Sequence, residues 1–285
     1  MSDSMKGNGE AAIEEGVSRH YGDGDLLERL LSGLEAAGLK REALRPEDLA
    51  PIEEFHIGGR KATEQLLARL SLAPEHRVLD VGCGIGGAVR FLAASVGCQV
   101  TGLDLTPEYI RVAKALTEAV GLDGKVHFDT GSALEMPYED ASFDTAISLH
   151  AAMNIAARGA LYEEIGRVLK PGGTLCLYDV MKKGDGELLF PVPWASSPEI
   201  SFLTTPEQTQ TLLEEAGFEV REIEDRTDFA IEFFRERLTS SPAGGAQPGV
   251  HLVMGESARE KFTNTLANIE RGCIDPFVMV ASRKG

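Results

Sequence analysis

The chain has 285 residues, of which 43% are hydrophobic, which suffices for one large α/β domain with additions. Its 45 acidic and 28 basic residues give a net charge of −17, which argues against a nucleic-acid or an anionic membrane partner. No apolar run reaches the roughly 20 residues that cross a bilayer, and the N-terminus resembles neither a signal nor a transit peptide. We therefore expect a cytoplasmic protein.

The four cysteines are scattered along the chain, without a CxxC pair and without a histidine at ligand spacing. A disulfide scaffold and a zinc site would both require clustered residues. The sequence therefore predicts reduced thiols and no metal site. These cysteines are Cys83, Cys98, Cys176 and Cys273.

The N-terminal part of the chain has helical patterning. Residues 23–38 (DGDLLERLLSGLEAAG) carry apolar residues at helical spacing, and the second part of residues 55–70 does so again. Between them, RPEDLAP at 45–51 is interpreted as a turn. Residues 1–73 are therefore expected to form a helical arm before a main domain at 74–285.

From residue 77 onward, strand-like apolar runs alternate with amphipathic helices. This alternation predicts a parallel, doubly wound α/β sheet that binds ligands at the ends of its strands. The expected strands are 77–81, 98–105, 125–131, 143–150, 174–181, 218–225 and 276–283. The expected helices are 86–96, 107–120, 160–170, 206–216, 227–238 and 255–272.

A glycine-rich segment, VLDVGCGIGG at 78–87, follows the first expected strand. Such a turn lets a ligand approach the backbone at a helix N-terminus. The spacing Gly82-x-Gly84-x-x-Gly87 fits a dinucleotide site, which would make the protein a nicotinamide dehydrogenase. However, Asp80 would then lie beside a pyrophosphate and repel it. A cationic or zwitterionic ligand suits this position much better.

The segment Asp80-x-Gly82-x-Gly84-x-Gly86 resembles the signature of class I S-adenosylmethionine-dependent methyltransferases. Three further segments agree with the resemblance, which spans roughly residues 55–225: Asp104 at the end of the second strand, GSALEMPYEDASFD at 131–144, and LKPGGTLCL at 169–177. Their order and spacing make the dehydrogenase the weaker alternative.

The resemblance implies a Rossmann-like, doubly wound sheet of seven strands, six parallel and the last antiparallel, with an insert after strand five. It implies S-adenosylmethionine as methyl donor, S-adenosylhomocysteine as product, and acceptor-pocket inserts at about 182–205 and 226–272. Ser132 departs from the family, which usually has an aspartate there. The donor-binding residues implied are His56, Gly58, Asp80, Gly82, Gly84, Gly86, Asp104, Leu105, Ser132, Ala133 and His150.

Candidate catalytic residues are His150, Asn154 and Tyr21. His150 could contact the donor, act as a base, or only close the strand, and Asn154 could orient the acceptor or cap a helix. Candidate acceptor-binding residues are Arg60, Met153, Phe190, Trp194 and Phe202; the three aromatic residues could instead pack the core of the insert.

The chain is most similar to sarcosine/dimethylglycine N-methyltransferases, which makes a small amine the leading small-molecule acceptor. One alternative is O- or C-methylation of an aromatic or isoprenoid metabolite. A third is a module that binds S-adenosylmethionine without catalysis. The sequence also leaves room for a homodimer.

Overall fold

The computed structural model describes residues 10, 13–16, 25–239 and 249–285. In these ranges seven strands form one sheet in the order β3-β2-β1-β4-β5-β7-β6, and β7 runs antiparallel to both of its neighbours. The predicted fold class is thereby confirmed. The strands are β1 (Arg77–Val81), β2 (Gln99–Asp104), β3 (Val126–Thr130), β4 (Phe143–Leu149), β5 (Leu169–Lys182), β6 (Phe218–Asp225) and β7 (Ile274–Arg283).

Helices cover both faces of the sheet, because successive side chains of each buried strand point to opposite faces. In β1, Val78 belongs to one core cluster, whereas Leu79 and Val81 belong to another. The first cluster includes side chains of α4 (Gly59–Leu67), α5 (Gly87–Ser95), α6 (Pro107–Ala119), α9 (Thr227–Thr239) and α11 (Ala258–Glu270). The second includes those of α7 (Arg158–Val168) and α8 (Pro206–Glu215).

The N-terminal arm contains α2 (Leu26–Ala36), the short η1 (Arg41–Ala43) and α3 (Pro46–Glu53) before α4. The turn predicted at 45–51 was wrong, because α3 covers it. Pro46 occupies the first helical position, where its missing N–H costs nothing, and the Asp48 carboxylate accepts the Arg45 N–H at 3.0 Å. Leu49 and Ile52 are fully buried and hold the helix against the domain.

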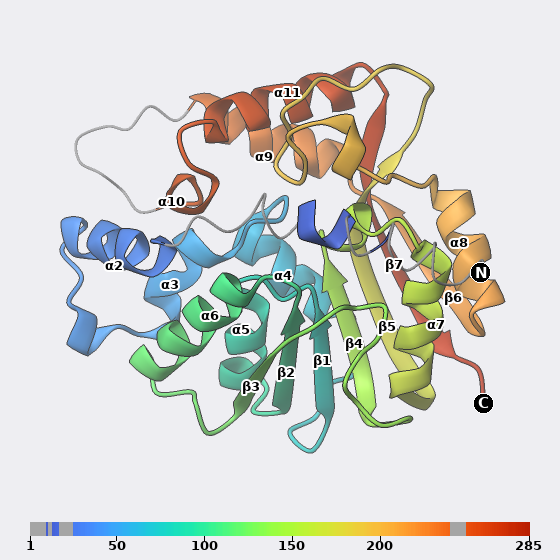
Figure 1. The fold of residues 1–285 in the computed structure, drawn as a ribbon, viewed down its shortest axis with the longest axis horizontal. Helices are drawn as coiled ribbons and strands as arrows, with labels where there is room; N and C mark the ends of the chain where they lie inside the picture. The colour runs from blue at the N-terminus through green and yellow to red at the C-terminus, as the bar shows by residue number, and fades with distance from the viewer. Residues whose placement is uncertain (1–9, 11–12, 17–24, 240–248) are drawn as a thin grey trace.

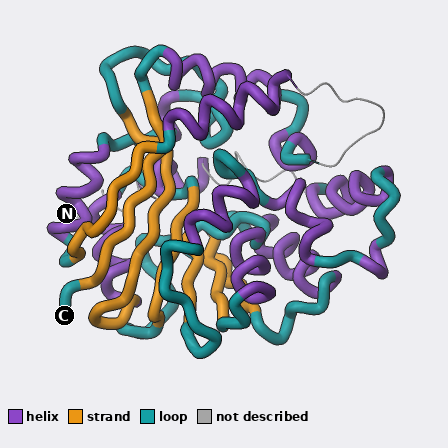
Figure 2. Tube along the Cα trace, turned by 180° about the vertical axis from the view of Figure 1, so that it is seen from behind, coloured by secondary structure: helices purple, strands orange, loops and turns teal. Residues whose placement is uncertain are grey.

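The C-terminal part of the chain lies above the carboxyl ends of the parallel strands. Figure 1 shows α9, α11 and the short α10 (His251–Met254) above these strand ends, and the view from behind shows the same arrangement (Figure 2). The helix predicted at 255–272 corresponds to α11, which begins at Ala258. The separate α10, which was not predicted, precedes it, and Gly255, with a positive φ of 73°, lies between the two. The remaining short helices are η2 (Ala152–Asn154) and η3 (Pro198–Ile200).

The arm and the C-terminal helices contact each other directly. The Arg29 side chain donates Nε–H to the Leu252 carbonyl at 2.6 Å, which joins α2 to α10. At Gly33, an added Cβ would lie 2.4 Å from Leu252 Cδ1, so the two helices pack closely there. None of the helices in the described ranges combines the length and apolar character of a membrane span.

Candidate active site

A cavity of about 320 Å³ opens at the carboxyl ends of the parallel strands. One part of its lining, here called the glycine-turn side, comes from β1, β2 and the segments that follow β1, β2 and β3. It consists of Asp80–Gly84, Gly87, Ala88, Leu103–Thr106, Tyr109, Gly131, Ala133 and Leu134. The other, the cap side, consists of Leu149–Ala151, Met153–Ala157, Pro193, Trp194, Val253–Gly255 and Lys261. Glu53–His56 and the N-terminal Glu10, Ile13 and Glu14 complete the described lining.

The glycine turn is fixed to the end of β2 by hydrogen bonds. The Asp104 carboxylate accepts the Gly84 N–H at 2.9 Å and the Thr106 N–H at 2.8 Å. Gly82 has a positive φ of 80°, and a Cβ there would lie 2.3 Å from the Ala151 Cβ. Glycine is therefore required at this position, where the glycine-turn side meets the cap side.

Asp80 supplies a buried carboxyl group that lacks a counterion. Its carboxyl is 2% exposed, and its Oδ1 has no hydrogen-bond partner among the described residues. Burial, with the nearby charges of Asp104 and Glu54, raises the pKa of Asp80 to about 8. Burial also raises the pKa of Asp104, although the Thr106 and Gly84 N–H groups oppose this. A cationic ligand would relieve both carboxylates.

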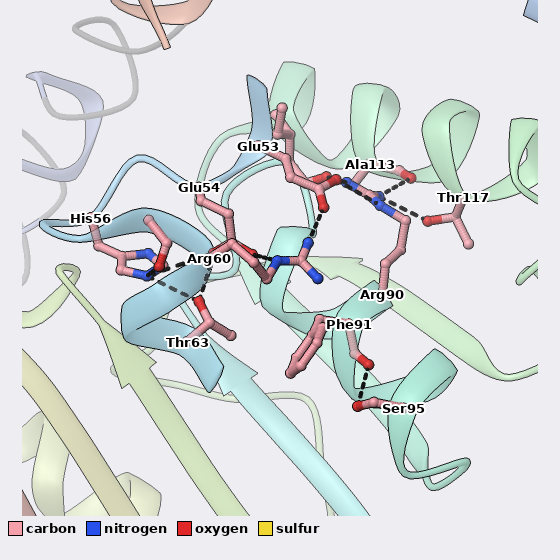
Figure 3. Close-up of polar contacts among 12 residues, drawn as sticks. Glu53, Glu54, His56, Arg60, Thr63, Arg90, Phe91, Ser95, Ala113 and Thr117 are labelled. Carbon is pink, nitrogen blue, oxygen red and sulfur yellow. Dashed lines mark hydrogen bonds and ion pairs between the residues drawn. The ribbon is translucent and has the colours of Figure 1, made fainter. Parts of the chain in front are cut away.

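Two other carboxylates of the lining are already paired within a buried network (Figure 3). Glu53 accepts hydrogen bonds from Arg90 Nη2 at 2.6 Å and Arg60 Nη2 at 2.7 Å. Glu54 lies 2.8 Å from Arg60 Nε. Arg60 therefore bridges the two carboxylates, and its guanidinium also lies 4.5 Å from the centre of the Phe91 ring.

The hydrogen bonds of His56 define its tautomer. Its Nε2 lies 3.2 Å from the Gly59 carbonyl, which can only accept, so the proton is on Nε2. The same nitrogen lies 3.0 Å from Thr63 Oγ1, which donates to Glu54. Burial lowers the pKa of His56, so the ring is neutral near pH 7 and Nδ1 is its remaining acceptor.

His150 is held by its backbone rather than by its ring. Its φ is 55°, its N–H donates to the Tyr178 carbonyl at 2.7 Å, and its ring centre is 4.7 Å from that of Tyr178. The buried Nε2 has no partner among the described residues. Burial, and secondarily the nearby His56, holds the pKa of His150 well below its usual range. The imidazole is therefore a neutral group with unused hydrogen-bonding capacity.

Asn154 anchors the insert that follows β5. Its Nδ2 donates to the carbonyls of Trp194 at 2.7 Å and Ile200 at 3.0 Å. The alternative that Asn154 caps a helix was wrong, because α7 begins at Arg158 after Ala157. The Trp194 side chain is 2% exposed, and its Nε1–H donates to Ser201 Oγ at 2.9 Å. The indole is thus a fixed part of the cap-side wall.

The cavity brings together most of the site residues predicted from the sequence. Those in its lining are His56, Asp80, Gly82, Gly84, Asp104, Leu105, Ala133, His150, Met153, Asn154 and Trp194. Those outside it are Gly58, Arg60, Gly86, Ser132, Phe190 and Phe202. Tyr21 lies outside the described residues.

The residues outside the lining have other contacts. Gly58 packs against Phe229, to whose ring a Cβ would come within 2.3 Å. The Ser132 hydroxyl donates to Glu14 and accepts the Leu134 N–H at 3.0 Å. Phe190 packs against the core, whereas the backbone N–H of Phe202 donates to the Met153 carbonyl at 2.9 Å.

Sequence reasoning did not identify the contribution of α10 and α11 residue by residue. Val253, Met254, Gly255 and Lys261 line the cavity although no local motif distinguishes them. Only the general expectation of an insert near 226–272 indicated this region. Glu53 and Glu54 were also missed, because their role depends on arginines that the fold brings to them.

The sheet is doubly wound, a glycine turn follows β1, a carboxyl group ends β2, and a second carboxyl group is buried beside the turn. Together these features define a class of nucleoside-binding α/β domain. Residues 79–177 match the family model described as "Methyltransferase domain". Methyltransferase GfsG of Streptomyces halstedii is 30% identical over 229 residues, which are 76% of this chain and 79% of that protein. The chain belongs to the S-adenosylmethionine-dependent methyltransferases.

Two other similarities show how varied this family is. The glycine/sarcosine/dimethylglycine N-methyltransferase of Actinopolyspora halophila is 29% identical over 179 residues, covering 63% of this chain and 32% of that protein. The solved geranyl diphosphate C-methyltransferase of Streptomyces coelicolor A3(2) has a TM-score of 0.69 at 17% identity, covering 95% and 98% of the two chains. Other relatives are named O-methyltransferases. The protein is therefore a small-molecule methyltransferase.

The residues of the glycine-turn side fit S-adenosylmethionine. The orphaned Asp80 carboxylate suits a ligand that carries an ammonium and a sulfonium, and Gly82 keeps the turn free of side-chain atoms. Asp104 retains carboxylate lone pairs beyond its two N–H partners. No group of three or more potential metal-ligating side chains occurs within the described ranges.

Proposed function

We propose that the protein methylates the nitrogen of a small amine held on the cap side of the cavity. One observation carries this proposal: the described cap-side lining has no carboxylate, and its one imidazole, His150, is neutral. An imidazole whose pKa lies well below the usual range is a weak base for an alcohol or phenol. A neutral amine attacks with its own lone pair and needs no strong base.

In this proposal, Asp80 and Nδ1 of His56 accept hydrogen bonds from the ammonium of the donor, and Asp104 accepts from its ribose. The donor supplies a methyl group on a positively charged sulfur, which keeps the electron pair of the broken carbon–sulfur bond. His150 would accept the N–H of a secondary amine such as sarcosine, whose methylated ammonium then releases its proton to water. Dimethylglycine has no N–H, and its product would be a quaternary ammonium that has no proton to release. Alignment of reacting groups contributes up to about 7–11 kcal/mol in such reactions.

The cap side also supports the second candidate, O- or C-methylation of an apolar metabolite. Met153 and Trp194 are 2% exposed and line the cavity, so an aromatic or isoprenoid acceptor would also bury its surface there. The two candidates differ in pH dependence. Amine methylation is expected to accelerate as the acceptor ammonium loses its proton, whereas phenol methylation is expected to follow ionisation of the phenol.

Methyl transfer to matched pairs of acceptors tests the proposal. We expect turnover of sarcosine or dimethylglycine but not of glycolate, in which a hydroxyl replaces the amine. His150→Asn keeps a residue that tolerates the left-handed backbone. It is expected to lower kcat/KM about 10–100-fold, with S-adenosylhomocysteine affinity within about twofold of wild type. Turnover confined to hydroxyl or carbon acceptors would reject the amine.

The domain boundaries, the cellular location, the exclusion of nucleic acid and the oligomeric state are also part of this proposal. We propose residues 1–73 as a helical arm, and 182–205 and 226–272 as acceptor-pocket inserts on the domain at 74–285. The four buried free thiols are consistent with a cytoplasmic location. The net charge of −17 disfavours nucleic acid as the substrate. A homodimer would be tested by light scattering.

A further inference from the structure

Lys261 is the one basic side chain in the described lining of the cavity. It projects from the first turns of α11, in the helical layer above the strand ends (Figure 1). Nothing in the glycine motif or in the ion-pair network accounts for a cation at this place. The other cationic groups near the cavity, Arg60 and Arg90, lie outside its lining and are paired with Glu53 and Glu54.

No ion pair of Lys261 occurs among the described residues. Its Nζ donates one hydrogen bond, to the Met254 carbonyl at 3.4 Å. Half-burial without a counterion lowers the pKa of Lys261. An unpaired, partly desolvated ammonium is costly unless a ligand supplies the opposite charge.

The charged side chains of the lining favour ligand groups of opposite sign on different sides of the cavity. Of the acidic side chains in the described lining, Asp80 and Asp104 belong to the glycine-turn side, and Glu53 and Glu54 are paired with arginines. Glu10 and Glu14 come from the N-terminal segment, and the segments that form the cap side contribute none. A cationic donor therefore matches the glycine-turn side, and an anionic group matches the cap side. One lysine offers a single charge, which suits one carboxylate better than a phosphate with nearly two charges.

We propose that Lys261 binds a carboxylate of the methyl acceptor and so makes the enzyme selective for acidic acceptors. This inference rests on the proposed location of the acceptor on the cap side, but it does not require the attacking atom to be nitrogen. A fixed ammonium near an acceptor amine also disfavours the protonated amine, which keeps more of it in the form that attacks.

The experiment compares acceptors that differ only in charge. Sarcosine is paired with sarcosinamide, and 4-hydroxybenzoate with 4-hydroxybenzamide; methylaminomethylphosphonate replaces the carboxylate of sarcosine by a phosphonate. Wild-type enzyme is expected to favour the carboxylate of the pair it methylates about 10–100-fold in KM, which is the range for a charge-assisted hydrogen bond. Lys261→Gln is expected to abolish that preference, whereas Lys261→Arg retains part of it.

A second readout does not depend on turnover. Acetylation of individual lysines by acetic anhydride, followed by mass spectrometry in protein saturated with S-adenosylhomocysteine, measures protection of Lys261. We expect the carboxylate acceptor, but not its amide, to protect Lys261 and to shift its labelling to higher pH. Lys114, which is exposed on α6, is the internal control, and Lys114→Gln is the matched variant.

The outcomes separate this inference from the proposed function. Equal KM values for a carboxylate acceptor and its amide, or a preference unchanged in Lys261→Gln, would overturn the role of Lys261 while leaving methylation intact. If the enzyme preferred methylaminomethylphosphonate to sarcosine, the proposed selectivity for a carboxylate would be wrong. Turnover of 4-hydroxybenzoate alone, with its preference lost in Lys261→Gln, would reject the amine acceptor and support Lys261.

Discussion

The two sides of the cavity are built in different ways. The glycine-turn side comes from strand ends and the turns that follow them, and hydrogen bonds from Gly84 and Thr106 to Asp104 fix its shape. The cap side is assembled from the segment after β4, the insert around Trp194 and the distant α10 and α11. The first side carries buried carboxylates, whereas the second carries a neutral imidazole and one ammonium.

This difference separates two tasks. A ligand shared by a whole family can be recognised by contiguous backbone turns, whose geometry tolerates little change. An acceptor that varies among relatives is read by additions whose residues contact the cavity one at a time. Variants on the first side should therefore alter donor affinity, and variants on the second should alter acceptor KM.

The largest effect expected is the pH dependence of donor binding. Because Asp80 has a pKa of about 8 in the empty protein, it must lose a proton before it can pair with a cationic ligand. The Kd for S-adenosylhomocysteine should fall about tenfold per pH unit between pH 6 and 8, or about 100-fold in all. Calorimetry in buffers of different ionisation enthalpy should show that about one proton is released at pH 6.5.

Asp80→Asn is the variant that tests this assignment. It should bind S-adenosylhomocysteine more weakly at pH 8, with little pH dependence. Because the pKa of Asp80 is raised above its unfolded value, the contribution of Asp80 to the unfolding free energy falls as pH rises from about 4 to 8. Asp80→Asn should lack this decline of the unfolding free energy with rising pH. A thermal melt of the variant at pH 8 shows whether it is folded. A wild-type pH profile in this variant would contradict the role of Asp80.

Asp104→Asn should have the next largest effect. The amide has one oxygen for the Gly84 and Thr106 N–H groups and accepts more weakly from a ribose hydroxyl. Donor affinity should fall about 10–30-fold, with a loss of about 1–3 kcal/mol in unfolding free energy. Calorimetry and urea denaturation measure the two effects. Asp123→Asn, an exposed loop variant, should change neither.

Asn154→Ala should affect the cap side alone. It leaves the buried carbonyls of Trp194 and Ile200 without their donor, which costs about 1–3 kcal/mol and loosens the insert. Acceptor KM should rise about threefold to tenfold while donor affinity changes less than twofold. Asn264→Ala removes a similar bond to the Pro191 carbonyl of the same insert, away from the cavity, and should leave KM unchanged. Equal effects of Asn154→Ala and Asn264→Ala on acceptor KM would contradict a specific role of Asn154 in shaping the cap side.

The smallest effect is expected at His56. Its ring should stay neutral with the proton on Nε2 from pH 6 to 8, because burial lowers its pKa and Gly59 accepts from Nε2. Nitrogen-15 chemical shifts of the labelled imidazole measure this directly. Thr63→Val is expected to preserve the tautomer, since the Gly59 carbonyl remains. A proton on Nδ1 in either protein would reverse the assignment of donor and acceptor atoms.

The sequence predicted the glycine-turn side well because its signals are local. The segment RVLDV, the glycines after it and Asp104 lie in adjacent strands whose order follows from alternation of strand and helix. Arg60 could not be interpreted in the same way, because its partners Glu53 and Glu54 are fixed only once α3 and α4 fold. The helix α3 was mistaken for a turn because its two prolines outweighed Leu49 and Ile52, whose burial is a tertiary effect.

The position of Lys261 at the cap side could not be predicted from the sequence either. Its position in an amphipathic helix resembles that of any surface lysine, and only the folded chain places it against the cavity. Phe190 and Phe202 illustrate the converse, since an aromatic-rich insert suggested three wall residues but Trp194 alone of the three reaches the lining.

The hydrogen bond from Arg29 to the Leu252 carbonyl joins α2 of the arm to α10, whose Val253 and Met254 line the cavity. Two segments 223 residues apart in the sequence thus hold each other beside the cavity. A truncation that removes α2 is therefore expected to loosen α10 as well, although α10 lies between β6 and β7 in the chain.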